Sequence, residues 1–211
     1  MTTPCVDVGL WILVATALGL VAAPHASADA NCAPGGPPPG AATRDVSALY
    51  GQPAMLWITD AFSTGITTAA GTGSTTVHTP SPMVQRALLI DAQQDGNHQL
   101  IVDTGRESNL YAASGCSVST VVDQQGEPFV FDEGHRRGNG DGVGCGDLGH
   151  GPHLVGYLNL EDQPGMMRRT ELDLDGTTAS IGPSDVVPTT TDLSCGGLTM
   201  RNDGLEAPYG H

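Results

Sequence analysis

The stretch Leu88-Leu-Ile-Asp-Ala-Gln-Gln-Asp-Gly-Asn-His-Gln-Leu-Ile-Val-Asp103 places two apolar runs on either side of an acidic loop. Short apolar runs bounded by turn residues are typical of β-strands, and an Asp-Gly pair between them favours a tight connection. The loop also offers the carboxylates of Asp91 and Asp95, which are ligands that a hard cation such as calcium prefers. We therefore expect two strands joined by a candidate cation loop.

The rest of the chain alternates short runs of Val, Ile, Leu and Thr with Gly, Pro, Asp and Asn, and no window has helical periodicity over three turns. The expected strands are Ala54–Thr59, Thr75–His78, Arg86–Asp91, Gln99–Asp103, Asn109–Ala113, Val118–Asp123, Pro128–Phe131, His153–Leu160, Arg169–Leu174 and Thr178–Ile181. The polar segment Phe62–Pro82 is expected to be a long loop. Many short strands predict an all-β fold, with propeller-like blades or a sandwich-like remnant of about three repeats.

Two internal echoes support the idea of repeats. Leu100-Ile-Val102 aligns with Leu154-Val-Gly156 at an offset of 54 residues, which places Asp91 near Asp147. Cys145-Gly-Asp-Leu148 likewise echoes Cys195-Gly-Gly-Leu198. The glycine-rich segment before the second copy adds Asp141, which with Asp147 can line another cation site. The alternative for that segment is a hydrated turn.

At residues 91–102 the sequence resembles the FG-GAP/VCBS repeats, the calcium-loop blades of integrin-like β-propellers. The resemblance puts Asp91 and Asp95 at the first and fifth loop positions, Gly96 at the sharp turn and the backbone carbonyl of Asn97 at the seventh position. It implies a propeller fold and calcium as a cofactor. Gln93 stands where the family has an acid or asparagine, and Gln99 replaces its closing acid. In the second copy, His150 and His153 stand where the family has acids.

The chain divides into three segments. Residues 1–28 are expected to be a signal peptide, because an uncharged apolar stretch ends shortly before Ala26-Ser-Ala28. No basic residue precedes that stretch, and a membrane anchor is the alternative. Residues 29–46 form a Pro/Gly-rich arm, and residues 47–211 form the all-β repeat domain. This organisation predicts a protein that is secreted or associated with the cell envelope.

The negative net charge of the chain argues against some classes of binding partner. The chain has 23 acidic residues against 8 basic ones, a net charge of −15, and every basic residue is arginine. No basic surface is available to neutralise phosphates or anionic lipids, so neither nucleic acid nor peripheral membrane binding is expected. The expected partner is a protein or glycan outside the cell.

The four cysteines beyond the signal peptide predict two disulfides in an oxidising compartment. Three pairings are possible, and we favour Cys116 with Cys145 and Cys32 with Cys195, since the first closes a short loop and the second ties the N-terminal arm to the last segment. A four-cysteine metal site is the alternative, but the chain lacks the C-x-x-C spacing typical of such sites.

The sequence favours a non-catalytic binding or scaffold protein over an enzyme. An alternative is an aspartic protease-like domain, because Asp103-Thr104-Gly105 after an apolar run resembles the protease signature, although only one copy is present. A further alternative is a transition-metal site built from His135, His150 and His153. A purely structural envelope protein is the third alternative.

Overall fold

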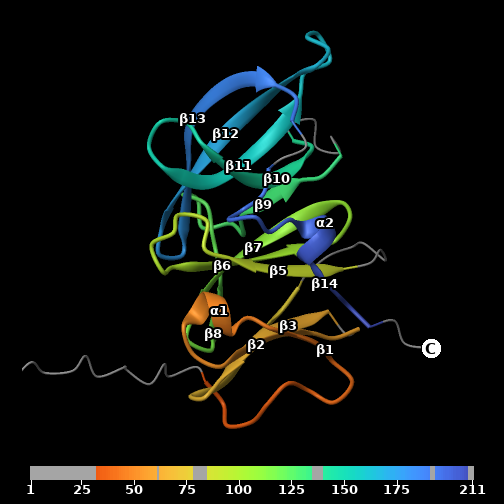
Figure 1. Ribbon diagram of the computed structural model, residues 1–211, viewed down its shortest axis with the longest axis vertical. Helices are drawn as coiled ribbons and strands as arrows, with labels where there is room; N and C mark the ends of the chain where they lie inside the picture. The colour runs from red at the N-terminus through yellow and green to blue at the C-terminus, as the bar shows by residue number, and fades with distance from the viewer. Residues whose placement is uncertain (1–31, 61, 78–84, 135–139, 191–192, 209–211) are drawn as a thin grey trace, which may run out of the picture.

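The computed structural model describes residues 32–60, 62–77, 85–134, 140–190 and 193–208, and these form three stacked antiparallel sheets (Figure 1). The all-β prediction is confirmed. No helix within these ranges has the length and apolarity needed to span a bilayer. The expected signal peptide, residues 1–28, lies outside the described residues.

The lower sheet is a four-stranded meander in the order β1-β2-β3-β4. Its strands are β1 (Ala42–Asp45), β2 (Ala54–Ile58), β3 (Ser63–Thr68) and β4 (Gly71–Thr76), with one helical turn, α1 (Ser47–Tyr50), between the first two. Residues 42–45 of the expected arm are therefore part of the folded body, since β1 pairs with β2 along its whole length.

The middle sheet has the order β14-β5-β6-β7-β8, and β9 also pairs with β7. Its strands are β5 (Arg86–Ile90), β6 (His98–Asp103), β7 (Glu107–Ser114), β8 (Ser117–Thr120), β9 (Val130–Asp132) and β14 (Leu205–Glu206). The opening stretch is thus a hairpin, in which Leu88 lies opposite Ile101. Both of its predicted strands are confirmed.

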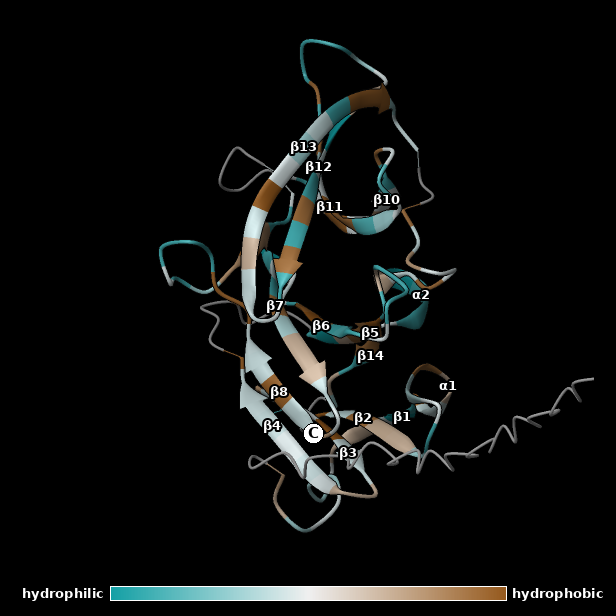
Figure 2. Cartoon of the chain, turned by 90° about the vertical axis from the view of Figure 1, so that its left-hand side faces the viewer, coloured by the Kyte–Doolittle hydropathy of each residue, from teal (hydrophilic) through white to brown (hydrophobic). Residues whose placement is uncertain are grey.

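The upper sheet is a second four-stranded meander, β10-β11-β12-β13. Its strands are β10 (Gly142–Asp147), β11 (Pro152–Asn159), β12 (Met166–Asp175) and β13 (Thr178–Pro188). Figure 2 shows the long β12 and β13 running along one side of the upper sheet. The chain then returns through α2 (Met200–Asp203) to add β14 to the middle sheet.

Apolar side chains cover both faces of the middle sheet. Leu89 and Leu100 belong to the core shared with the lower sheet, whereas Leu88 and Ile101 belong to the core shared with the upper sheet. All four side chains are at most 5% exposed. A strand with one solvated face alternates apolar and polar residues, so the uninterrupted runs at 87–90 and 100–102 result from burial on both faces.

The segment Phe62–Pro82, expected to be a loop, instead contains β3 and β4. Its threonines are β-branched and suit a strand. They carry too little apolar surface for the sequence to indicate that the segment is buried. Two glycines explain how such a thin hairpin packs. A Cβ at Gly65 would collide with the Trp57 ring, and a Cβ at Gly73 would collide with the backbone of Cys116.

The glycine-rich segment expected to wrap a cation or form a turn is instead the edge strand β10. Its glycines alternate with larger residues, and Val143 packs against the upper core. A Cβ at Gly142 would collide with the Tyr157 hydroxyl, and one at Gly144 with Leu193. Residues of one kind at every second position are typical of a strand, and in β10 the repeated residue is glycine and not an apolar residue.

Two disulfides are present as predicted, but the favoured pairing of Cys116 with Cys145 and of Cys32 with Cys195 is wrong. Cys32 is bonded to Cys116 and Cys145 to Cys195, with Cα atoms 5.8 Å and 4.9 Å apart. The prediction relied on the short distance between Cys116 and Cys145 along the chain. In the structure Cys116 lies on the β7–β8 turn of the middle sheet, whereas Cys145 lies on β10 of the upper sheet.

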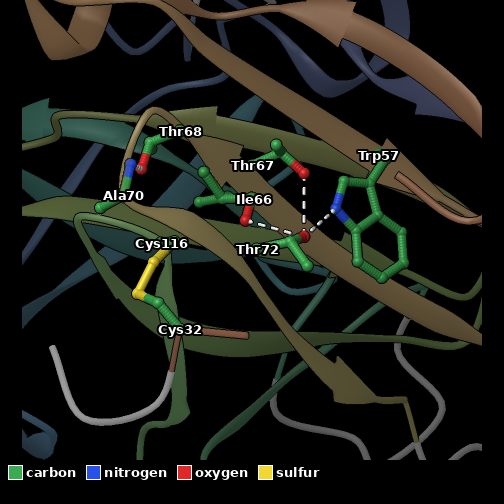
Figure 3. The surroundings of a disulfide bond; sticks show 8 residues. All are labelled: Cys32, Trp57, Ile66, Thr67, Thr68, Ala70, Thr72 and Cys116. Atoms are coloured by element: carbon green, nitrogen blue, oxygen red, sulfur yellow. Dashed lines mark hydrogen bonds between the residues drawn. A yellow bond between two sulfur atoms is a disulfide. The ribbon is translucent and has the colours of Figure 1, made fainter. Parts of the chain in front are cut away.

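The Cys32–Cys116 bond fastens the N-terminal segment across the junction of the lower and middle sheets (Figure 3). Next to it, Ala33 and Thr72 exchange two backbone hydrogen bonds of 2.9 and 2.8 Å, so the arm extends the lower sheet beside β4. The Thr72 hydroxyl accepts from the indole N–H of Trp57 at 3.3 Å and pairs with the Thr67 hydroxyl at 2.8 Å.

The three sheets stack as a column and, over the described residues, close no barrel. The expected repeats stay a prediction. The propeller arrangement is not confirmed. The two aligned segments do share a local structure, since β5–β6 and β10–β11 are both antiparallel hairpins.

Replacing Cys32 and Cys116 together with serine is expected to lower the free energy of unfolding by about 2 to 5 kcal/mol, because an 84-residue loop is released in the unfolded chain. Denaturant unfolding of this variant and of the Cys145→Ser/Cys195→Ser pair measures both bonds. Peptide mapping without reduction that recovered Cys116 joined to Cys145 would contradict the structure.

Candidate functional site

The Asp91–Asn97 loop is held together by its own backbone. Asp91 accepts the N–H groups of Asp95 and Gly96 at 3.1 and 3.0 Å, and Asp95 accepts the N–H of Asn97 at 2.9 Å. The backbone hydrogen bond from Asn97, followed by the one from its side-chain amide, lowers the pKa of Asp95. These hydrogen bonds favour the ionised form of Asp95, and both aspartate side chains shape the turn.

Gln99, which stands where the repeat family has its closing acid, closes this loop through neutral hydrogen bonds. Its side chain is buried, accepts the N–H of Ala92 at 2.9 Å and donates to the carbonyl of Asn97 at 2.8 Å. That carbonyl is the oxygen assigned to calcium by the resemblance, and one of its two lone pairs already accepts from Gln99. Calcium at Asp91, Asp95 and Asn97 stays a prediction.

The structure does not bring Asp141 and Asp147 together. Asp141 directly precedes the strand β10 and Asp147 is its last residue, so six steps of about 3.3 Å place the two roughly 20 Å apart. Asp147 accepts the N–H groups of Gly149 and Gly151, which lower its pKa and form the β10–β11 turn. Asp141 accepts the N–H of Asn159 at the opposite end. The predicted shared cation site is therefore wrong.

The Asp103-Thr104-Gly105 triplet forms the β6–β7 turn. Asp103 accepts the N–H of Gly105, and the buried Thr104 donates its hydroxyl and its N–H to the carbonyl of Glu107. This is the local structure of a strand-ending turn. Asp103 itself is only partly buried, and its neighbourhood is what gives it functional interest.

Asp103 lines a cleft of about 560 Å³ between the middle and upper sheets. The middle sheet contributes Leu88 and Ile101 to its apolar floor, and the upper sheet contributes Val143, Tyr157 and Met167. Further lining comes from the segment that leads through α2 back to the middle sheet, including Thr190, Leu193 and Arg201. Concave sites with an apolar floor and a few polar groups are the usual form of a ligand site.

Glu133 is the most perturbed acid of this cleft. It follows β9 directly and accepts the Ser108 hydroxyl at 2.7 Å, while Ser108 is itself fully buried. Burial, and then the negative charges of Asp103, Asp132 and Asp141, raise the pKa of Glu133 to about 7, against the lowering effect of the Ser108 hydrogen bond. The carboxyl is therefore poorly solvated and near its titration midpoint at neutral pH.

Tyr157 on β11 lies close to the same negatively charged residues. Burial and the charges of Glu133, Asp141 and Asp103 raise its pKa. Three acids from β6, from the end of β9 and from the start of β10 thus converge on one region, although their sequence positions span 38 residues. Arg86 lies directly across from Asp103 in the β5–β6 register, but it also forms an ion pair with Glu206 at 3.4 Å.

Sequence reasoning missed Glu133 because Asp132-Glu133 looks like a solvated acidic pair. In the structure Asp132 is buried and Glu133 is partly buried. The useful signal was the run Phe129-Val-Phe131 just before them, which marks a strand that enters the core and carries the acids inward. Of the histidines considered for a metal site, His150 and His153 share the β10–β11 hairpin, and His135 lies outside the described residues.

Comparisons with known proteins identify no relative: no protein-family model, curated protein or solved structure matches this chain. The resemblance to FG-GAP/VCBS repeats therefore stays an expectation from the sequence.

The raised pKa of Glu133 predicts a specific pH dependence of stability. The ordinary Glu value is 4.5 and the folded value is about 7, so the folded state holds an extra proton between them and loses stability as pH rises through this window. Glu133→Gln keeps an acceptor for Ser108 and abolishes the ionisation. The variant is expected to match the wild type at pH 4 and to exceed it by roughly 1 to 3 kcal/mol at pH 8.

Denaturant titrations across this pH range measure the difference, with the exposed Glu127→Gln as the matched control. Parallel stability curves for the wild type and Glu133→Gln would contradict a buried, partly protonated Glu133.

Proposed function

We propose that the protein is an exported, non-catalytic binding domain whose cleft takes a basic side chain of an extracellular protein partner. The observation that carries this proposal is the cleft itself, in which Glu133 is poorly solvated and shares its surroundings with Asp103. Two disulfides support an oxidising compartment.

The physical reason is charge compensation. A half-buried carboxyl near other acids has an unfavourable ionised form, and an arginine or lysine side chain placed beside it restores that form. The apolar floor from Leu88, Ile101 and Met167 fits the aliphatic stem of such a side chain, while the charged end reaches Asp103 and Glu133. Binding is therefore coupled to loss of a proton from Glu133.

The second candidate function is acid hydrolysis with Asp103 as a catalytic carboxyl. The observation in its favour is that Asp103 faces the same cleft as Glu133, whose pKa it raises. Two carboxyls in different protonation states are the requirement for acid–base catalysis on a peptide bond. The Asp103-Thr-Gly turn is present once in the chain, so the second carboxyl would be Glu133 and not a second signature.

Binding of a labelled hexa-arginine peptide is expected to weaken in the double variant Asp103→Asn/Glu133→Gln and to stay near wild type in Asp91→Asn/Asp95→Asn. Both variants lose two acidic residues, so the comparison separates the cleft from the general negative charge of the protein. Fluorescence anisotropy at physiological salt measures the affinity. Wild-type affinity is expected to rise between pH 6 and pH 8 as Glu133 ionises, and Glu133→Gln is expected to remove this rise.

Equal weakening in both double variants would contradict cleft binding. Incubation of the protein with a peptide library at pH 4 to 7 tests the hydrolytic alternative. Cleavage that is lost in Asp103→Asn would replace the binding proposal by the catalytic one.

A further inference from the structure

A buried carboxylate lies in the upper sheet, apart from the cleft residues already discussed. Glu171 on β12 is 2% exposed, and its Oε2 atom has no hydrogen-bond partner within the described part of the chain. The neighbouring Arg169 does not supply the missing charge, because its guanidinium makes two hydrogen bonds to Asp185 at 3.0 and 2.6 Å. A buried carboxylate is unfavourable unless a positive charge lies beside it, and a bound cation would supply that charge.

Metal-ligating side chains surround this carboxylate. Nδ1 of His153 lies 3.4 Å from Oε1 of Glu171, and Nδ1 of His150 lies 3.9 Å from Oε2. One ligand atom each from His153, Glu171 and Asp173 fall within 4.8 Å of one another. Ligands of a tetrahedral ion with bonds of about 2.0 to 2.1 Å lie about 3.3 Å apart, so small side-chain rotations close this set around an ion.

The fold positions these residues without help from a ligand. Asp147 holds the β10–β11 turn that carries His150, and Nδ1 of His153 donates to the carbonyl of Gly151 at 3.0 Å. Coordination of an ion through Nδ1 would replace this hydrogen bond, whereas coordination through Nε2 would keep it. On β12, the register against β13 shifts between Thr170 and Leu172, so that Glu171 faces two residues of β13, Gly182 and Pro183. Such β-bulges re-aim side chains, and they recur beside functional sites.

Gly182 leaves room for the acidic part of the cluster. A Cβ at this position would lie 3.0 Å from a carboxylate oxygen of Asp173 and 3.3 Å from the Cβ of Glu171. A larger residue would therefore press on both acids. The glycine is consistent with a site that must keep its oxygens free to approach an ion.

We propose that His153, Glu171 and Asp173, with His150 as the fourth ligand, form a site for a divalent transition metal of the zinc class. Imidazole nitrogens combined with carboxylate oxygens suit zinc better than calcium, which prefers an all-oxygen shell. The first hairpin offers the carboxylates of Asp91 and Asp95 and the β10–β11 hairpin offers imidazoles, so the two loops would select different cations. The site is independent of the cleft and of the function proposed for it.

Calorimetric titration of the full, oxidised protein with zinc chloride is expected to show one saturable site per chain. Glu171→Gln, which preserves shape, and His153→Ala are each expected to weaken zinc binding by at least about tenfold. Asp175→Asn is the matched control, because it removes one exposed acid from the same strand and should leave the affinity unchanged. Cobalt substitution provides a second readout, the visible absorption of a low-symmetry site.

Circular dichroism and thermal unfolding check that each variant is folded, and His153→Asn repeats the test if Glu171→Gln does not fold. No saturable zinc binding by the wild type would overturn the proposal, as would unchanged affinity in folded Glu171→Gln and His153 variants.

Discussion

Burial of the middle sheet on both faces is the constraint on which the rest of the molecule depends. Neighbouring residues on β6, such as Leu100 and Ile101, enter different cores, so the lower and upper sheets each need this sheet as a partner. Within the described residues, each outer sheet contributes to one apolar core, which it shares with the middle sheet. At about 25 cal/mol per Å² of apolar area, removing either cover exposes a surface that a marginally stable protein cannot leave in water.

The same constraint places the functional candidates. Because the upper sheet sits across the middle one, the end of β6 and the residue after β9 meet, so that Asp103 and Glu133 line one cleft. Asp141 does not line the cleft, but its charge acts on Glu133. The candidate metal cluster arises differently, from a turn and a bulge within the upper sheet alone. The cleft therefore depends on the stacking of sheets, whereas the metal cluster depends on local hairpin geometry.

Much of the fold was predictable from the sequence, and the exceptions share a cause. Strands with large apolar residues, such as 86–90 and 98–103, can be recognised in the sequence as short apolar runs. The strands β3, β4 and β10 use threonine and glycine, and neighbouring backbone or side-chain atoms approach glycines of each strand too closely for a larger residue. Such closeness is a tertiary property that no local pattern reveals. The predicted disulfide pairing was wrong for the same reason, since the sheet on which a cysteine lies decides its partner and distance along the chain does not.

The site was less predictable than the fold. Asp103 was recognised through a motif that proves to be a turn, and Glu133 gained its character only from burial beside acids distant in sequence. His150 and His153 were recognisable from their spacing, but their acidic partners on β12 emerged only from strand register.

The doubly buried middle sheet is tested most directly by replacing adjacent residues of β6. Leu100→Ala and Ile101→Ala each remove a side chain that is at most 2% exposed, one from each core. Denaturant unfolding is expected to show a loss of about 2 to 5 kcal/mol for each variant. A large loss for one variant and a negligible one for its neighbour would mean that one face of the sheet is solvated, and would contradict the three-layer structure.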